Sequence, residues 1–175
     1  MHAVSIKFLL HVLYRIQKTF CLFPFIFASA LCIPATAADL PDPLHTPGAT
    51  DPAVTQETIS TTICVKGYTR TVRPPSSYTN NLKREQLDTY YKGQGEMGTV
   101  EEDHLVPLTI GGHPTAVENL WPEAYIGEYG ATYKDNCEVA TGRAICSGTV
   151  GLVEAQQGFM SNWIDWCKQL MGEPQ

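Results

Sequence analysis

The segment EEDHLVPLTIGGHPTAVENLWPE, residues 101–123, decides the fold of this chain. It opens on a short strand-like run, passes through a turn-rich loop that contains Gly111 and Gly112, and closes on the brief run NLWPE. Short runs of this kind, joined by a loop rich in glycine and proline, are typical of paired strands. We therefore expect two strands here, with the adjacent Asp103 and His104 near the end of the first.

Helical patterns flank this segment on both sides. The stretch NNLKREQLDTYYK, residues 80–92, has helical spacing and predicts a short helix upstream. Downstream we expect a helix from about Tyr133 to Ile145, with Thr132 as its N-cap and Asp135 as the partner in a capping box. A last helix is predicted from an amphipathic stripe at steps of three or four, formed by Leu152, Gln156, Phe159, Trp163, Trp166 and Leu170.

The N-terminal part of the chain has the pattern of an export signal. Residues 1–37 combine three basic residues, the apolar run TFCLFPFIFASALCI and the small-residue pattern Ala35-Thr36-Ala37. We therefore expect a secretory signal peptide that is cleaved after Ala37. A membrane anchor is the alternative, but the apolar run is shorter than the roughly 20 residues that a span needs.

Two further regions follow the expected cleavage site. Residues 38–57 are rich in proline and have no periodic apolar pattern, which predicts an extended leader. Residues 58–172 are expected to form one folded domain. At its start STTICVKGYTRTVRPP, residues 60–75, alternates β-branched and aromatic residues with polar ones and predicts a strand or hairpin.

Charge and cysteine usage also suit an exported protein. All 18 acidic residues but only nine of the 12 basic ones follow residue 37, so the remaining 138 residues carry nine excess negative charges. This argues against a globally basic nucleic-acid binder. Four cysteines remain there, an even number that predicts two disulfides in an oxidising compartment, with three pairings possible. We expect Cys64 with Cys146 and Cys137 with Cys167, because the last two lie on neighbouring predicted helices.

The charge is unevenly distributed along the chain. Residues 66–92 carry six basic residues and four tyrosines against two acidic residues, whereas residues 96–138 carry nine acidic residues and one lysine. The first segment can attract a polyanion and the second a cation, although two solvated faces of opposite sign would give the same pattern. Expected phosphate contacts come from Lys66, Arg70, Arg73, Lys83 and Arg84.

The order strand, loop, strand, helix with Asp-His near its start resembles a known superfamily. EEDHLVPLTIGG, then ENLWPE, then a KD-x-x-E helix is similar to the HNH endonuclease superfamily, also called the ββα-metal or His-Me finger fold. ICVKGYTRTVRPP upstream, and AICSG and VEAQQ downstream, resemble a secreted bacterial branch of that superfamily. The resemblance implies an α+β fold, with a small ββα-metal finger embedded in a single disulfide-stabilised domain that has a C-terminal amphipathic helix.

The resemblance also implies roles for individual residues. His104 would be the general base on water, and Asp103 would be a ligand of one divalent metal ion, Mg²⁺ first and Mn²⁺, Ni²⁺ or Zn²⁺ as alternatives. Neutral imidazole suits a base at neutral pH, and a carboxylate suits Mg²⁺. Gly111 and Gly112 would let the loop turn tightly, and Asn119 would bond across that loop to hold His104 in place.

The second metal ligand is expected on the predicted helix after the strands. Glu138 lies where the resemblance places one ligand, and Asp135 is the fallback, although it can equally favour the helix N-terminus as an anion. The sequence departs from the related secreted proteins at Gly142, where they tend to carry a His. His113, in the loop, is expected to be solvated rather than a ligand.

The resemblance favours a secreted or periplasmic, metal-dependent nuclease that cuts DNA, RNA or both with little sequence specificity. Its partner would be the nucleic-acid substrate, without stable membrane association after signal cleavage, and the sequence leaves the oligomeric state open. Gly142 and the negative charge favour one alternative, a non-catalytic, disulfide-stabilised HNH-like domain that has lost part of its metal site and binds a partner or nucleic acid. A secreted structural or inhibitor-like protein without a metal is the other alternative.

Overall fold

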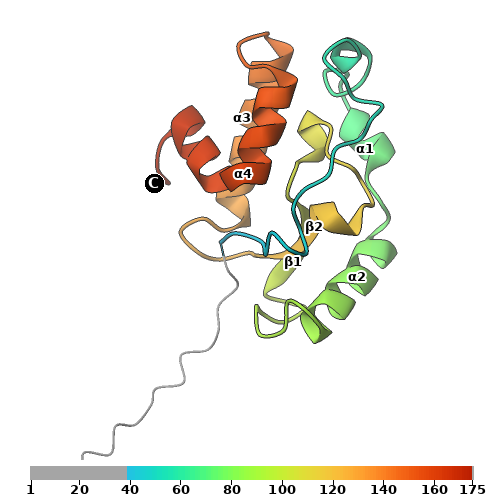
Figure 1. Ribbon diagram of the computed structural model, residues 1–175, viewed down its shortest axis with the longest axis vertical. Coiled ribbons are helices and arrows are strands. Elements are labelled where there is room, and N and C mark those ends of the chain that lie inside the picture. The colour runs from blue at the N-terminus through green and yellow to red at the C-terminus, as the bar shows by residue number, and fades with distance from the viewer. Residues whose placement is uncertain (1–38, 175) are drawn as a thin grey trace, which may run out of the picture. The chain divides into compact units, whose positions relative to one another are not determined.

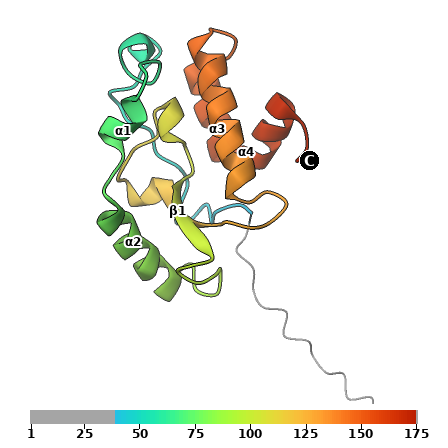
Figure 2. The ribbon, with the colours of Figure 1, turned by 180° about the vertical axis from the view of Figure 1, so that it is seen from behind.

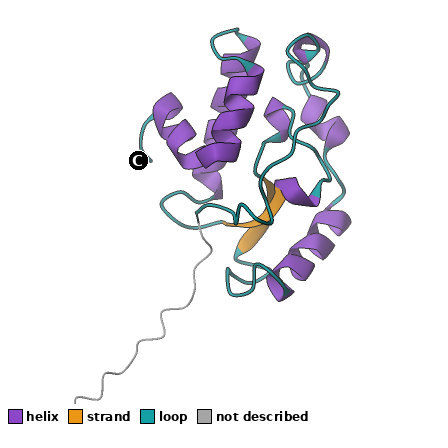
Figure 3. Ribbon diagram, viewed as in Figure 1, coloured by secondary structure: helices purple, strands orange, loops and turns teal. Residues whose placement is uncertain are grey.

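A computed structural model describes residues 39–174 of the chain, so the expected signal peptide lies outside the described residues. This part is an α+β domain in which helices surround one two-stranded antiparallel sheet (Figure 3). The longer elements are α1 (Tyr68–Val72), α2 (Ser76–Asp88), β1 (Val100–His104), β2 (Leu120–Ala124), α3 (Ala131–Cys146) and α4 (Leu152–Met171). Three single-turn 3-10 helices accompany them: η1 (Ile59–Thr61), η2 (Leu108–Ile110) and η3 (Val117–Asn119).

The two predicted strands are confirmed, and they pair with each other. Val100 lies opposite Ala124 and His104 lies opposite Leu120, so the sheet ends at His104. The loop between the strands folds back on itself at Gly112, where a Cβ atom would lie only 1.7 Å from the carbonyl oxygen of Val106. No other residue fits this turn, as the glycine pair in the sequence predicted.

The helices pack on two sides of this sheet. Helix α2 contacts both strands, and α3 and α4 pack against each other and against η2 in the loop (Figures 1 and 2). The stripe predicted on the last helix enters the core through Leu152, Phe159 and Trp163, each with at most 1% of its surface exposed. None of the helices in residues 39–174 is long and apolar enough to cross a membrane.

Both expected disulfides are present. Cys64 is bonded to Cys146 and ties the segment before α1 to the end of α3. Cys137 is bonded to Cys167 and joins α3 to α4. Two disulfides in a domain of this size fit an oxidising compartment.

The strand or hairpin predicted over residues 60–75 is wrong, because this segment forms part of η1 and the whole of α1. Local hydrogen bonds explain the difference: the hydroxyl of Thr62 donates to the carbonyl of Thr58, and the hydroxyl of Thr71 donates to that of Tyr68. Threonine side chains that bond to nearby backbone compete with strand pairing. The β-branched pattern therefore misleads here.

Helix α3 was predicted at nearly the correct position but with the wrong cap. It begins at Ala131, its N-cap residue is Gly130, and no side chain caps it, so Thr132 and Asp135 lie inside the first turns. Ser147 and Gly148 end the helix as expected.

The proline-rich segment 39–57 lies along the folded domain. The carbonyl of Asp39 accepts a hydrogen bond from the indole of Trp163 at 2.9 Å, and the ring of His45 stacks on Tyr90 with 4.2 Å between centroids. Further along, Thr50 forms a β-bridge with Gly112. The segment therefore forms turns at residues 43–45 and 52–53 where an extended leader was predicted, and it contacts both the core and the loop between the strands.

Candidate functional site

The carboxyl end of β1 brings the Asp-His pair against α3. Asp103 and His104 are the last two residues of the strand, and the hydroxyl of Thr109 in η2 donates to the carbonyl of Glu138 on α3 at 3.3 Å. The loop after β1 thus holds the middle of α3 close to the pair. This is the strand, loop, strand and helix order that the sequence predicted.

His104 is held in one orientation inside the protein. Only 3% of its surface is exposed, and its Nε2 lies 3.0 Å from the carbonyl oxygen of Pro114. Because a carbonyl only accepts, Nε2 carries the hydrogen, and in a neutral ring Nδ1 then carries the lone pair. Burial lowers the pKa of His104, against an opposing effect of Asp103. The ring is therefore neutral at pH 7, with Nδ1 able to accept a proton.

Asn119 braces the loop between the two strands, as expected. Its amide nitrogen donates to the carbonyl of Val106 at 3.0 Å and to that of His113 at 3.1 Å. Its carbonyl oxygen accepts the N–H of Val106 at 2.8 Å and the N–H of Ala49 at 3.3 Å. Asn119 has no exposed surface. Its four bonds fix the loop that carries Pro114, and so they fix the acceptor of His104.

A buried lysine lies at the centre of the site and was not expected from the sequence. The ammonium of Lys134 on α3 donates to the carboxylate of Asp103, to the carboxylate of Glu138 at 2.5 Å and to the carbonyl of His104 at 2.9 Å. Its side chain has no exposed surface. Lys134 therefore connects the end of β1 to α3, and it brings Asp103 and Glu138 to one point.

A second residue that was not predicted is Glu123 on β2. It is 1% exposed, and its carboxyl group lies 4.0 Å from the ammonium of Lys134. Both of its carboxyl oxygens are buried, and neither has a hydrogen-bond partner within residues 39–174. Burial raises its pKa well above the usual range, and the carboxylate of Asp103 adds to this effect. Burial therefore favours the neutral form of Glu123.

The charges of the cluster divide its carboxyl groups into two kinds. Burial raises the pKa of Asp103, but Lys134 and His104 outweigh it, and the pKa falls to about 2. Burial raises the pKa of Glu138 to about 8 despite the same ammonium. Burial lowers the pKa of Lys134, but the surrounding carboxyl groups outweigh this effect and raise that pKa well above the usual value. Asp103 and Lys134 thus form the permanent ion pair of the site.

One basic residue of the predicted phosphate-binding set acts on the site. Arg73 follows α1, is exposed, and makes no ion pair within residues 39–174. Burial is the main cause of the lowered pKa of His104, and the charge of Arg73 adds to it. The same charge opposes the burial that raises the pKa of Glu101 to about 7. Arg73 is therefore an exposed cation whose charge acts on His104.

The remaining members of that set lie in different environments. Lys66 and Arg70 are exposed around α1, and Arg84 is exposed on α2, where it donates to Asn81 at 3.3 Å. Lys83 has to be removed from the set. Its side chain is buried, and its ammonium donates to the carbonyls of Met97 at 2.9 Å and Val100 at 2.8 Å. Its charge thus fixes the start of β1 and is not offered to a ligand at the surface.

The secondary candidates are also located. His113 is part of the loop framework, because its Nδ1 accepts the N–H groups of Thr115 at 3.3 Å and Ala116 at 3.0 Å. Asp135 is exposed on α3. Gly142 lies one helical turn beyond Glu138 and adds no side chain to the cluster.

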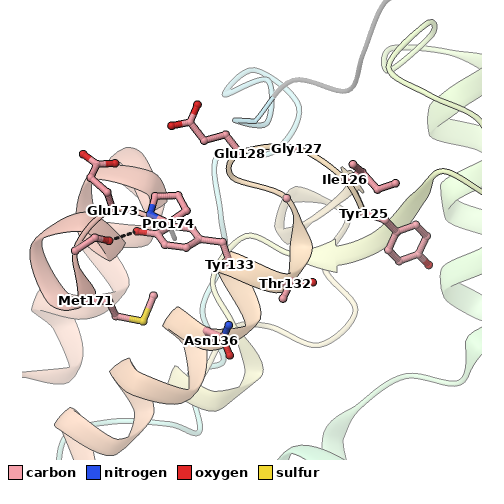
Figure 4. Close-up of a pocket in the computed structure, with 12 residues that line it drawn as sticks. Tyr125, Ile126, Gly127, Glu128, Thr132, Tyr133, Asn136, Met171, Glu173 and Pro174 are labelled. Carbon is pink, nitrogen blue, oxygen red and sulfur yellow. Dashed lines mark hydrogen bonds between the residues drawn. The ribbon is translucent and has the colours of Figure 1, made fainter.

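Cavities lie on more than one side of α3. One of about 610 Å³ is formed by the start of α3, the turn before it and the C-terminal end, where the hydroxyl of Tyr133 donates to the carbonyl of Gly172 at 2.7 Å (Figure 4). Its lining includes the carboxylates of Glu128 and Glu173, so it does not suit an anion. Another, of about 730 Å³, lies between the later turns of α3 and the segment before α1.

The side chains of the site can supply only some of the ligands that a divalent ion needs. Residues 39–174 contain no group of three or more His, Cys, Asp or Glu side chains arranged to hold a metal ion. Asp103 and Glu138 nevertheless converge, and each gives one oxygen to Lys134 and keeps another. The orphaned carboxyl of Glu123 beside them gives the cluster more carboxyl groups than cations. Mg²⁺ is commonly held by one or two carboxylates together with water and substrate phosphate, and Asp103 and Glu138 would supply its protein ligands only through the oxygens that Lys134 does not bind.

Comparison of the chain with protein-family models, with curated proteins and with solved structures finds no match. The site is therefore interpreted from its geometry. The spacing of Lys134 and Glu138 could have revealed their contact, because residues four apart share one face of a helix. Nothing in the sequence marks Glu123 except its place in NLWPE. The alternation of residues along a strand does not show whether other elements cover both faces of the sheet.

Proposed function

We propose that this chain is a secreted, metal-dependent nuclease that hydrolyses phosphodiester bonds of DNA or RNA with little sequence specificity. In this proposal, β1, β2 and α3 form a ββα-metal finger. The main support is the orientation of His104: its Nε2 is bound to the carbonyl of Pro114, its ring is neutral, and it stands next to the ionised Asp103. A neutral, oriented imidazole beside an anionic ligand is suited to general-base catalysis.

The side chains of the site then have distinct tasks. His104 accepts a proton from the attacking water at Nδ1, and Asn119 keeps the loop that orients it in place. The exposed guanidinium of Arg73 contacts the substrate phosphate, since its charge already acts on His104. Lys134 holds Asp103 and Glu138 together.

Asp103 and Glu138 would hold the divalent ion, which when bound supplies neutralisation of the charge that develops on the phosphate and the departing oxygen. The protein contributes the convergence of the two carboxylates, one from β1 and one from α3. Two protein ligands leave room for water and for the substrate phosphate.

Export is part of the proposal. The pattern of residues 1–37 is that of a secretory signal, and the two disulfides in the described part of the chain fit an oxidising compartment. A nuclease released there would meet nucleic acid outside the cytoplasm.

The test is nicking of supercoiled plasmid by the purified protein without residues 1–37, in Mg²⁺, Mn²⁺ or EDTA. We expect nicking with a divalent ion and none in EDTA. His104→Ala should reduce the rate by a factor of about 100 to 10,000. His45→Ala is the matched control, because the contacts of the His45 side chain are with Tyr90 and Asp42 and not with Asp103 or His104. If His104→Ala keeps more than a tenth of the wild-type rate, the general-base assignment is refuted.

One observation favours a second candidate, a non-catalytic HNH-like domain that binds nucleic acid or a protein. The ammonium of Lys134 occupies the point where Asp103 and Glu138 converge, and Gly142 supplies no further ligand. In such a domain the lysine would have replaced the metal ion. Wild-type protein that binds an oligonucleotide but cuts none with any divalent ion would establish this candidate.

A further inference from the structure

The cavity between α3 and the segment before α1 is lined by basic residues, although the domain as a whole is acidic. It holds about 730 Å³, and its wall on one side is the segment from Ile63 to Thr69, while the other side is the last turns of α3. Lys66 and Arg143 belong to these two opposite walls, and no Asp or Glu lines the cavity. Neither cation makes an ion pair within residues 39–174.

This absence of carboxylates contrasts with the net negative charge of the chain. The part beyond residue 37 carries nine excess negative charges, and the cavity at the start of α3 is lined by Glu128 and Glu173. A cavity that contains two uncompensated cations is therefore a local site of positive potential. Concave positive sites concentrate anions even on a protein of opposite net charge.

The walls of the cavity are held in place by covalent and helical structure. The Cys64–Cys146 disulfide lies in its lining and fixes the segment that carries Lys66 to the end of α3. Gly142 also lines the cavity, and a Cβ at this position would touch Thr109 at 3.4 to 3.5 Å. The residue that departs from the resembled pattern thus forms part of the floor of the cavity.

The cavity adjoins the proposed catalytic site. Thr109 lines the cavity and also donates to the carbonyl of Glu138. Gly142 follows Glu138 by one turn of α3, a distance of about 6 Å along the helix axis. In one strand of a duplex, about 3.4 Å separates neighbouring phosphates along the axis, so this distance corresponds to about two nucleotides.

We infer that this cavity binds a nucleotide of the substrate strand one or two positions from the cleaved bond. Lys66 and Arg143 contact its phosphate, and the apolar part of the lining, with Tyr68 and Val139, contacts its sugar and base. The inference rests on the proposed function, because it takes the ligand to be nucleic acid. It adds a subsite that extends the contacts of the substrate from Arg73 to the far end of α3.

The test measures binding of a fluorescein-labelled single-stranded octadeoxynucleotide by anisotropy, in EDTA so that no cleavage occurs. The variant Lys66→Glu/Arg143→Glu should lower the affinity at least tenfold. It should also make the dependence of log affinity on log salt less steep by about 0.7, because the two residues contact one phosphate and each phosphate of a single strand that the protein neutralises contributes about 0.7 to the slope. Lys92→Glu/Lys168→Glu is the matched control, because neither residue lines the cavity or belongs to the predicted phosphate-binding set.

A second variant separates the shape of the cavity from its charge. Gly142→Leu places a side chain on the floor, so it should weaken binding by about the same factor as the charge variant but leave the salt dependence as in the wild type. Thermal melting of each variant checks that the domain is folded. The subsite is refuted if the Lys66/Arg143 variant binds like the wild type, if the control variant loses as much affinity, or if the wild type does not bind the oligonucleotide.

The same experiments distinguish this inference from the proposed function. A protein that binds the oligonucleotide through Lys66 and Arg143 but nicks no plasmid keeps the subsite and loses the nuclease. A protein that nicks plasmid with an unchanged Michaelis constant in the Lys66/Arg143 variant keeps the nuclease and loses the subsite.

Discussion

Replacing Lys134 by methionine tests whether one ammonium holds the site together. Lys134→Met preserves most of the volume of the side chain but removes its hydrogen bonds to Asp103, Glu138 and the carbonyl of His104. A hydrogen bond to a charged group contributes about 1.5 to 3 kcal/mol. The variant also gains, because the cost of burying an ammonium, several kcal/mol, is no longer incurred.

The balance of these effects is a substantial decrease in stability. Removing one partner of a buried ion pair costs about 3 to 5 kcal/mol, since the remaining charge is left uncompensated. A domain of this size has an unfolding free energy of about 5 to 15 kcal/mol, so the variant loses at least about a fifth of it. We expect the melting temperature to fall by about 10 °C.

The measurement is urea unfolding followed by circular dichroism, with the disulfides intact. Lys168→Met is the matched control: Lys168 pairs with Glu173 at 3.3 Å and lies over the ring of Tyr129 at the surface, so its replacement should change the unfolding free energy little. Adding Asp103→Asn to Lys134→Met removes the stranded carboxylate, and the double variant should be more stable than the sum of the two single effects predicts. The reasoning is refuted if Lys134→Met costs no more than Lys168→Met.

Three further predictions concern metal, pH and salt. Asp103→Asn should raise the Mg²⁺ concentration for half-maximal nicking, and an unchanged requirement would remove Asp103 as a ligand. Burial raises the pKa of Glu102 to about 8 and that of Glu138 to about 8 from 4.5, so the folded state binds more protons than the unfolded state between these values. Its unfolding free energy in EDTA should therefore fall as the pH rises from about 5 to about 8, as measured by urea unfolding at each pH. Reversing Arg70 and Arg73 to Glu should raise the Michaelis constant on DNA more than it lowers the turnover number, and normal kinetics at low salt would show that substrate binds elsewhere.

Local patterns in the sequence predicted the structure correctly where tertiary packing required the same arrangement. The strand pair around the loop of residues 105–119 was predicted because Gly112 has only one workable role, a turn that no Cβ can enter. The last helix was predicted because its stripe is wide enough to need a core, and Phe159 and Trp163 are in that core. The disulfide partners followed from helices that were correctly expected to be neighbours.

The segment around α1 was mispredicted because its side chains offered two solutions. Alternating threonines and aromatic residues suit a strand, but a strand needs a partner, and β1 is already paired on one edge with β2 and covered by α2. The threonines instead satisfy local backbone carbonyls, and the bond from Cys64 to Cys146 fixes the segment near α3. Which solution wins depends on the rest of the fold and not on the segment.

The contacts between charged groups at the site were the property that the sequence predicted least well. A count of residues 96–138 places Lys134 among nine acidic residues, where it looks like a minor correction to a negative surface. Folding turns its face of α3 inward, so that the single ammonium meets Asp103 from β1, Glu138 from its own helix and, at 4.0 Å, Glu123 from β2. Burial strengthens each of these interactions, because the interior screens charge less than water does. Lys134, which seemed unimportant in the charge count, therefore sets the ionisation of Asp103 and the approach of Glu138. Metal binding in the proposed nuclease depends on these two groups.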